Sequence, residues 1–288
     1  MPTVAVFNQK GGVAKTTTAV NLAALWARRG HRTLLVDMDA QGNATAAFGI
    51  APRPLKGVYD LLVEAATVEE VIRTSCMDNL WILPSTPNLS GLDVALSGVL
   101  EPQLVLRRAL ESPSADAEYV VIDCPPTLGL PSVNALVAAG ELVIPTFCYR
   151  HAQDGLHATW ANVRRMARRI NPVLRINGVL LISPDSNEVS RRTADIIRAE
   201  FGDKVYQTFI PGDNLIPLAE ESDMPLVLLH PDAPAAKAYE KALGEIEQRI
   251  YNASRSSLRN VESTAEDEAK ELVTPSSWLS MIEEPGQR

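Results

Sequence analysis

The sequence comprises 288 residues, of which 46% are hydrophobic, and carries a formal net charge of −8 at pH 7. A chain of this length can bury a substantial core, and α/β folds of this size are often one domain. Its three cysteines, Cys76, Cys124 and Cys148, are widely spaced and odd in number, which favours neither a disulfide framework nor a zinc site. No signal-peptide pattern opens the chain, and its longest uncharged stretch, residues 124–140, is too short and too interrupted by proline to span a bilayer. We therefore expect a cytoplasmic location.

Apolar runs and helical patterns alternate along the chain, as a doubly wound sheet requires. The predicted strands are, in order, Thr3 to Phe7, Thr33 to Val36, Leu80 to Leu83, Tyr119 to Ile122, Leu142 to Thr146, Gly178 to Ile182 and Val205 to Phe209. The predicted helices are Lys15 to Arg29, Val68 to Ile72, Pro102 to Leu110, Pro131 to Ala139, Leu156 to Ile170, Ser190 to Phe201 and Pro234 to Tyr251. The predicted fold class is α/β, a doubly wound, mostly parallel sheet flanked by helices.

The composition changes after about Asn252. Residues 252–288 contain four basic and seven acidic residues and many serines. We predict one domain over residues 1–251 and a flexible acidic tail over 252–288. An apolar group near the end of the tail, Trp278, Leu279, Met281 and Ile282, is flanked by Glu283 and Glu284. Because basic residues normally accompany a membrane-surface helix, these flanks argue against a membrane anchor.

A glycine-bearing turn stands between the first predicted strand and the first predicted helix. Residues 8–18 read Asn-Gln-Lys-Gly-Gly-Val-Ala-Lys-Thr-Thr-Thr. Backbone N–H groups and the helix dipole converge on one anion at such a turn. Lys15 would add a charge at the β- and γ-phosphates, and the Thr16 hydroxyl would be a magnesium ligand. The turn predicts a site for ATP or GTP; the alternative is an ordinary turn with two solvated lysines.

The usual phosphate-loop pattern is not met at two positions. It requires glycine where Gln9 and Ala14 stand. Lys10 supplies a second lysine at the same turn, and two neighbouring cations favour a polyanion such as a triphosphate. Alanine at position 14 adds one methyl group, which is tolerated if the position keeps a negative φ.

Aspartates follow two other predicted strands. Asp37 and Asp39 come at the end of one, and Asp123 at the end of another. Open α/β sheets bind ligands at the carboxyl ends of their strands, where aspartates can hold Mg²⁺ through water and orient an attacking water. The three aspartates are therefore expected beside the glycine-bearing turn.

Together these motifs resemble those of the ParA (Soj) and MinD ATPases. Residues 10–17, Lys-Gly-Gly-Val-Ala-Lys-Thr-Thr, are similar to the deviant Walker A motif of that family, with Lys10 as its signature lysine. Residues 37–45 resemble the second motif of ParA proteins, and residues 119–136 resemble their Walker B region. The resemblance runs from about Thr3 to Ile250.

The resemblance implies a P-loop ATPase that uses ATP and Mg²⁺. Its nucleotide-binding residues would be Lys10, Gly11, Gly12, Val13, Ala14, Lys15, Thr16 and Thr17, with Pro211, Gly212 and Asp213 near the adenine. Thr16 would bind the metal directly, Asp123 would hold its water shell, and Asp39 would complete the metal site and position the attacking water. Lys10, Lys15 and Asp39 are the expected catalytic residues of a slow, partner-stimulated ATPase, with Lys10 reaching the nucleotide of a second subunit.

The same resemblance implies an ATP-bound homodimer, nonspecific nucleoid DNA and a ParB-like DNA-bound partner. Five arginines and no acid lie between Gly155 and Pro184 in this acidic protein, which indicates a local footprint for a phosphate backbone. The candidate DNA-binding residues are Arg164, Arg165, Arg168, Arg169, Arg191 and Arg192. The alternative is that these arginines are solvated or paired with acids elsewhere.

The expected function is ATP-dependent partition of chromosome or plasmid DNA, with the protein associated with the nucleoid. Two other readings remain open. One is a MinD-like ATPase that positions a protein cargo or binds a membrane, and the other is a metabolic ATP-dependent ligase or amidase of the same fold. The segment Ile210 to Ile216 lacks the arginines common in ParA proteins, so DNA binding would rely on the arginines named above.

Overall fold

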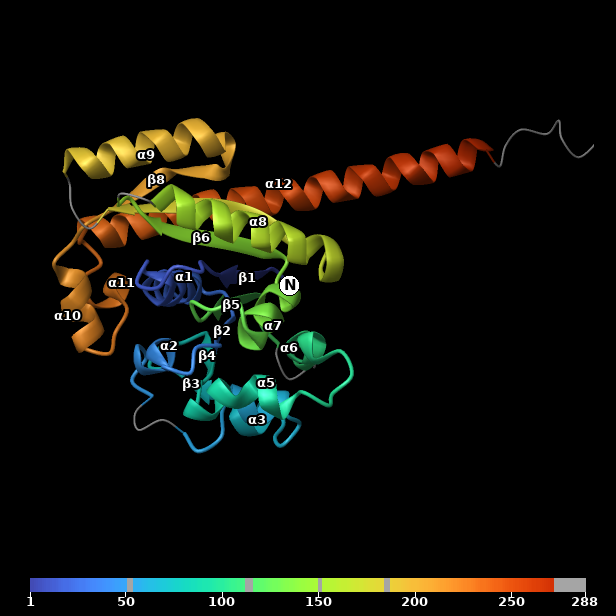
Figure 1. The fold of residues 1–288 in the computed structure, drawn as a ribbon, viewed down its shortest axis with the longest axis horizontal. Helices are drawn as coiled ribbons and strands as arrows, with labels where there is room; N and C mark the ends of the chain where they lie inside the picture. Colours follow the sequence, from blue (N-terminus) through green and yellow to red (C-terminus); the bar gives the residue numbers. More distant parts are fainter. Residues whose placement is uncertain (51–53, 112–115, 150–151, 184–186, 272–288) are drawn as a thin grey trace, which may run out of the picture. The chain divides into compact units, whose positions relative to one another are not determined.

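The computed structural model describes residues 1–50, 54–111, 116–149, 152–183 and 187–271, the last fifteen of these by their backbone alone. Eight strands form one sheet in the order β3-β4-β2-β5-β1-β6-β7-β8 (Figure 1). All neighbours are parallel except the antiparallel pair β3 and β4. The strands are β1 Thr3–Val6, β2 Thr33–Asp37, β3 Arg73–Thr74, β4 Leu80–Leu83, β5 Tyr119–Asp123, β6 Glu141–Phe147, β7 Arg175–Ser183 and β8 Val205–Pro211.

Helices occupy most of the connections between strands. The α-helices are α1 Lys15–Arg28, α2 Asn43–Ala46, α3 Val58–Leu62, α4 Val68–Val71, α5 Leu92–Ala95, α6 Val105–Leu110, α7 Leu130–Ala138, α8 Ala152–Ile170, α9 Glu188–Phe201, α10 Leu215–Glu221, α11 Leu226–Leu229 and α12 Pro234–Glu271. Three short 3₁₀ helices complete the described elements, η1 Pro87–Gly91, η2 Pro102–Leu104 and η3 Gly202–Lys204.

The chain winds away from β1 in both directions. The connection β1–α1–β2 leads toward the β4 side of the sheet, whereas β5–α7–β6 leads toward the β8 side. Because such crossovers are right-handed, α1 and α7 cover opposite faces. The central strands are accordingly buried on both faces and read as continuous apolar runs, such as Val-Val-Ile in β5. The direction of winding reverses at β1, which is where doubly wound sheets open their ligand crevice.

Strand register brings the acidic strand ends to one level. Asp123, the last residue of β5, is paired with Val6 of β1 on one side and with Asp37 of β2 on the other. The glycine-bearing turn leaves β1 at this same edge and enters α1. The sequence prediction that these motifs meet is therefore confirmed by the strand pairing.

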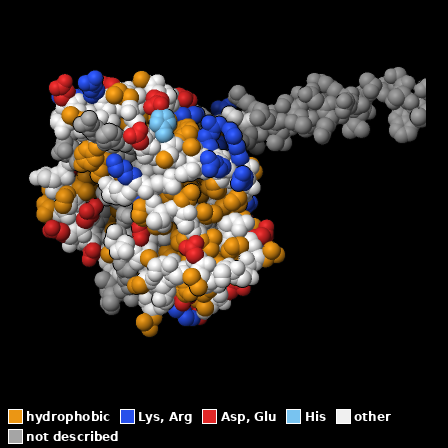
Figure 2. Space-filling view, viewed as in Figure 1, with side chains coloured by type: hydrophobic (Ala, Val, Ile, Leu, Met, Phe, Trp, Pro, Cys, Tyr) orange, Lys and Arg blue, Asp and Glu red, His pale blue; other side chains and the backbone are white. Residues whose placement is uncertain are grey.

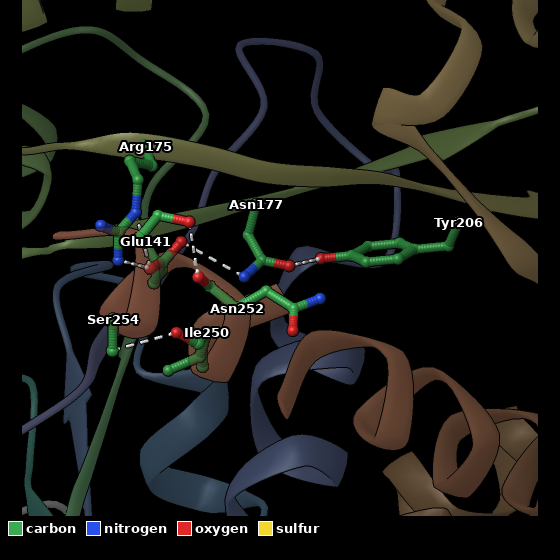
Figure 3. A network of polar contacts seen from close by, with 8 residues as sticks. Glu141, Arg175, Asn177, Tyr206, Ile250, Asn252 and Ser254 are labelled. Atoms are coloured by element: carbon green, nitrogen blue, oxygen red, sulfur yellow. Dashed lines mark hydrogen bonds and ion pairs between the residues drawn. The ribbon is translucent and has the colours of Figure 1, made fainter. Parts of the chain in front are cut away.

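A second polar group lies at the opposite, amino-terminal ends of β6, β7 and β8 (Figure 3). The buried carboxylate of Glu141 accepts hydrogen bonds from Arg175 at one oxygen and from Asn177 Nδ2, at 3.2 Å, at the other. The Tyr206 hydroxyl donates to Asn177 Oδ1 at 2.6 Å. This group joins three adjacent strands through side chains, so it is a structural contact of the sheet.

The predicted fold class is confirmed, and the predicted strands and helices all occur with ends shifted by a few residues. The prediction omitted β3 and the short helices α2, α3, α5, α10 and α11. The helix end predicted at Tyr251 is wrong, since α12 continues to Glu271. No glycine or proline interrupts residues 252–271, so nothing in that stretch stops a helix.

The chain divides into two compact units, Met1–Ile246 and Glu247–Arg288. The first contains the whole sheet; the described part of the second is the continuation of α12. The predicted division at residue 252 stays a prediction, and the apolar group Trp278, Leu279, Met281 and Ile282 lies outside the described residues. Within the described chain, no helix combines the length and apolar character needed to cross a membrane.

Candidate functional site

A cleft of about 1010 Å³ opens at the carboxyl edge of the sheet. Most of the sequence-predicted nucleotide residues line it, and they come from three separate parts of the chain. They are Gly11, Gly12, Val13, Ala14, Lys15, Thr16 and Thr17 from the turn and α1, Asp39 after β2, and Pro211, Gly212 and Asp213 at the end of β8. The cleft is large enough for a nucleotide-sized ligand, since small-molecule sites measure about 300–1,000 Å³.

Lys15 is the buried cation of this cleft. Only 7% of the residue is exposed, and its ammonium donates a hydrogen bond to the backbone carbonyl of Lys10 at 3.0 Å. Burial lowers the pKa of Lys15, and the nearby acid Asp123 acts in the opposite direction. A cation held by a single carbonyl is poorly compensated for the loss of water, so an anion entering the cleft would stabilise it.

Thr16, the residue after Lys15, is hydrogen-bonded to Asp123 at the end of β5. The Thr16 hydroxyl donates to Asp123 Oδ2 at 2.7 Å, and Asp123 is fully buried. Its other oxygen, Oδ1, is buried without a hydrogen-bond partner among the described residues. Burial, reinforced by the charge of Asp37, raises the pKa of Asp123 well above its usual value. An orphaned carboxylate oxygen next to a hydroxyl is the donor set that a hard cation or its bound water requires.

Asp37 and Asp39 differ in their surroundings. Asp37 is fully buried and accepts hydrogen bonds from the Thr45 backbone at 2.8 Å, the Thr45 hydroxyl at 2.7 Å and the Asp39 backbone at 3.1 Å. Burial nevertheless raises the pKa of Asp37 to about 6. Asp39 is half-buried, lines the cleft, and accepts from the Gln41 backbone through Oδ1 at 2.9 Å. These contacts give Asp37 a structural role, because they hold the turn between Asp39 and Thr45 against the end of β2.

Ala14 adopts a conformation that the sequence argument did not allow for. Its φ is 58° and its ψ is 36°, in the left-handed region. A negative φ, the condition under which an alanine would be tolerated here, is therefore not met. The turn must reverse direction before the first helical N–H groups, and Gly12, with φ 64°, shares this geometry. In the left-handed region the alanine Cβ lies too close to the following carbonyl oxygen, a clash that glycine lacks, so the loop is strained at this residue.

Lys10 is exposed and directly precedes Gly11, which lines the cleft. Its backbone N–H donates to Asn8 Oδ1 at 3.0 Å, and its side-chain Cδ lies 3.8 Å from where a Cβ on Gly155 of α8 would stand. No ion pair holds the ammonium within the part of the chain that the structure describes. The expected reach of Lys10 into a second subunit stays a prediction.

The expected adenine-edge residues lie on the far side of the cleft. Pro211 ends β8, and Gly212 and Asp213 follow. The Asp213 carboxylate is engaged with backbone N–H groups, those of Leu215 at 3.0 Å and Ala235 at 3.3 Å. It therefore fixes the turn into α10 and the start of α12. Its contact with a nucleotide stays a prediction.

The six candidate arginines are all exposed, four on α8 and two on α9. Within the described residues, none of them forms an ion pair with a carboxylate. Lys and Arg side chains gather on the face seen in Figure 2, where the end of α8 lies in Figure 1. Arg175, from the same acid-free stretch, is different because it is paired with Glu141. The two arginine helices thus carry cations with no partner supplied by the described chain.

Sequence reasoning missed several residues of the cleft. Glu220 of α10 accepts a hydrogen bond from the Thr17 hydroxyl at 2.9 Å, and both line the cleft. Tyr239 of α12 also lines it and is 3.3 Å from the Thr18 hydroxyl. These contacts join residues more than 200 positions apart, so no local pattern could reveal them. Asn43 was the exception, since it lies inside the aspartate motif of residues 37–45.

The described chain contains no preformed group of three or more His, Cys, Asp or Glu side chains that could hold a metal. Magnesium takes few protein ligands and completes its shell with phosphates and water. Cys124 and Cys148 are buried as expected of small hydrophobic residues, whereas Cys76 is exposed. Burial raises the pKa of the Cys124 thiol well above its usual value, so it is a neutral thiol.

Known proteins resemble this chain over most of its length. The family described as an AAA domain matches residues 1–176. The sporulation initiation inhibitor protein Soj of Bacillus subtilis is 40% identical over 238 residues, covering 82% of this chain and 94% of that protein. The chromosome-partitioning ATPase Soj of Treponema pallidum is 37% identical over 248 residues, covering 86% and 97%.

Among solved structures, a cobyrinic acid a,c-diamide synthase from Mycobacterium smegmatis with a bound ATP analogue and magnesium is 29% identical. It superposes with a TM-score of 0.75 over 85% of this chain and 93% of that one. The identity to the Soj proteins is higher, and their matched regions span nearly their full lengths. The chain therefore belongs to the Soj/ParA family of chromosome-partitioning ATPases.

Proposed function

We propose that this chain is a partition ATPase that binds ATP and Mg²⁺ in the cleft, dimerises when loaded, holds nonspecific DNA with α8 and α9, and releases it on hydrolysis. The observation that carries the nucleotide site is the convergence of Lys15, Thr16, Asp123 and Asp39 on one edge of the sheet. The unpaired arginines of α8 and α9 support DNA as the cargo surface.

Each residue of the cleft has a role that its contacts support. Lys15 would exchange the Lys10 carbonyl for the phosphates of the nucleotide, because a charged acceptor forms the stronger hydrogen bond. The Thr16 hydroxyl would turn from Asp123 to magnesium, and the freed carboxylate would hold metal-bound water. Magnesium supplies charge neutralisation for phosphoryl transfer. Asp39 lines the cleft, and its Oδ2 accepts no hydrogen bond from the described residues, so it would orient the attacking water.

Dimerisation would depend on Lys10, because this residue is exposed and lies outside the cleft lining, whereas the buried Lys15 lines the cleft of its own subunit. A lysine that acts only across an interface makes nucleotide occupancy a switch for association. Two subunits present twice the arginine surface, so contacts to DNA phosphates gain by avidity and counterion release. Hydrolysis then separates the subunits and lowers the affinity for DNA.

The central experiment measures self-association, ATP hydrolysis and nonspecific DNA binding in ATP, in ADP and without nucleotide. We expect Lys10→Ala to abolish productive dimers and Asp39→Ala to accumulate ATP-bound dimers on DNA. Normal dimerisation and hydrolysis by Lys10→Ala would show that the cross-subunit role is wrong. A ParB-like centromere-binding protein added with DNA is expected to raise the slow basal turnover.

The DNA surface has a matched control within the chain. Arg164 and Arg165 are adjacent and unpaired, whereas Arg107 and Arg108 of α6 are adjacent and paired with Glu111 and Glu101. Neutralising the α8 pair to alanine should weaken DNA binding uniformly across sequences and reduce the slope of log affinity against log salt by about 1 per lost phosphate contact. The same substitutions at Arg107 and Arg108 should change neither the affinity for DNA nor its salt dependence. Binding to anionic vesicles instead of DNA would favour the MinD-like alternative.

A further inference from the structure

The start of the phosphate loop is tied to helix α8 by a buried hydrogen-bond group. The Asn8 carboxamide, 2% exposed, accepts at Oδ1 from the Lys10 backbone and from the Thr159 hydroxyl, both at 3.0 Å. Its Nδ2 donates to the Pro145 carbonyl of β6 at 2.9 Å. Asn8 is thereby fixed to the sheet, and its acceptor oxygen is shared between the loop and α8.

A second set of contacts connects the same two elements. The backbone N–H of Gln9 donates to Thr159 Oγ1 at 3.2 Å, and Asn162 Nδ2 donates to Gln9 Oε1 at 2.9 Å. The methylene chain of Lys10 passes Gly155, one turn before Thr159. Residues 8–10 therefore lie along one face of α8, and three successive turns of that helix contact them.

The carbonyl of Lys10 connects this loop to the phosphate-binding lysine. It accepts a hydrogen bond from the Lys15 ammonium at 3.0 Å. The Lys15 ammonium has two further N–H donors, and phosphates that accept from them would draw it away from the Lys10 carbonyl. A shift of Lys10 would then act on Thr159 through Asn8, because the Lys10 backbone N–H and the Thr159 hydroxyl both donate to Asn8 Oδ1.

The buried hydroxyl of Thr159 does more than fill space in the core. It is fully buried on α8, where valine would fill the same volume without a polar atom to satisfy. Its hydroxyl both donates to Asn8 and accepts from Gln9, and both partners belong to the loop. The same helix carries Arg164, Arg165, Arg168 and Arg169 within the following three turns.

We propose that Thr159 is a positioning residue that links the Lys10 loop to helix α8, so that nucleotide occupancy sets the placement of the α8 arginines. The proposal rests on the proposed function, in the role of Lys15 at the phosphates and in the binding of DNA by α8. Because binding linkage is reciprocal, DNA held by α8 must change the affinity for ATP by the same factor that ATP changes the affinity for DNA.

The test compares Thr159→Val with the native chain by two readouts. The first is the ratio of DNA dissociation constants in ADP and in ATP, which we expect to fall by at least about fivefold. The second is the ATP-induced change in the emission of Trp160, the neighbour of Thr159, which packs edge-on against Phe201 of α9 at 5.2 Å. Its contribution is isolated by subtracting the Trp160→Phe variant, and we expect Thr159→Val to abolish it.

Three further variants make the result decisive. Thr159→Ser should restore both readouts because it returns the hydroxyl. Asn162→Ala, at a half-buried position, should weaken both without threatening the fold. Thr193→Val on α9 is the matched control, since its hydroxyl bonds to no residue in the described ranges, and it should leave both unchanged.

Folded Thr159→Val and Asn162→Ala proteins that keep the native Trp160 response and the native affinity ratio would overturn the proposal. A native chain that binds no DNA in any nucleotide state would instead refute the DNA part of the proposed function. In that case the Trp160 response alone still decides whether Thr159 links the loop to α8.

Discussion

Two groups of buried charged side chains lie at opposite ends of the same sheet, and they differ in how many of their polar atoms have hydrogen-bond partners. At the amino-terminal ends of β6 to β8, both oxygens of Glu141 have donors, supplied by Arg175 and Asn177. At the carboxyl ends of β2 and β5, Asp123 Oδ1 has no partner among the described residues, and Lys15 bonds to a single carbonyl. Groups of the first kind complete a structure, whereas groups of the second kind are left for a ligand to complete.

The largest effect is expected from removing Lys15, the cation of the group that lacks partners. Lys15→Ala should lower ATP turnover by about 10²–10³-fold, because one charge-stabilising donor at a reacting phosphoryl group is lost. It should also abolish the difference between ATP and ADP in self-association. Steady-state phosphate release and sedimentation velocity measure these effects. Turnover within about twofold of the native value would remove Lys15 from the chemistry.

The complete group should respond in stability instead of activity. The Glu141 side chain is only 4% exposed, so Arg175→Ala leaves a buried carboxylate without its cation. We expect the free energy of unfolding to fall by about 3 kcal/mol, toward the lower end for a broken buried pair because Arg175 itself is half exposed. Urea denaturation measures this, with ATP turnover per folded molecule unchanged. A loss of ATP turnover per folded molecule would contradict the purely structural role of the Arg175–Glu141 pair.

A pH titration sharpens the contrast at the incomplete group. The pKa of Asp37 is raised to about 6 by burial, so the native chain holds a proton that the unfolded chain releases from about pH 4 upward. This contribution to stability is present at low pH and is lost as the pH rises from about 4 to 6. Relative to Asp37→Asn, which does not titrate, the native free energy of unfolding should fall by about 2 to 3 kcal/mol over that window.

The measurement uses nucleotide- and magnesium-free protein and reports the difference between the two chains at each pH, in which groups distant from Asp37 cancel. Asp123 does not cancel, because the charge of Asp37 raises its pKa, and it adds to the loss of stability with rising pH. A flat difference from pH 4 to 7 would show that Asp37 keeps its ordinary pKa despite its burial.

The smallest effect concerns the strained residue of the loop. Ala14→Gly removes the steric cost of a left-handed alanine but adds chain entropy, for a net gain of about 0.5 to 1 kcal/mol in unfolding free energy. Gly12→Ala makes the opposite change at φ 64°, with open space around the added methyl group, so it should destabilise by a similar amount. Thermal unfolding of the three proteins decides this. Equal destabilisation by both changes would contradict the strain at Ala14.

Much of the nucleotide site follows from the sequence. Lys15, Thr16, Asp39 and Asp123 stand after predicted strands, and parallel strands bring their carboxyl ends to one edge. The backbone of Ala14 could not be predicted in the same way. A loop of this composition allows either sign of φ, and the closure of the turn onto α1 selects the positive one.

The sequence by itself determined the α/β class, the strand order in the chain, and the chemistry of the strand ends, because hydrophobic periodicity and short motifs are local. Only the tertiary structure decided that Thr17 meets Glu220, that Glu141 meets Arg175, and that Thr159 meets Asn8. Such contacts depend on where the sheet and its crossovers place distant segments. Whether a buried polar group is completed or left open is decided by those segments, since its partners come from elsewhere in the chain.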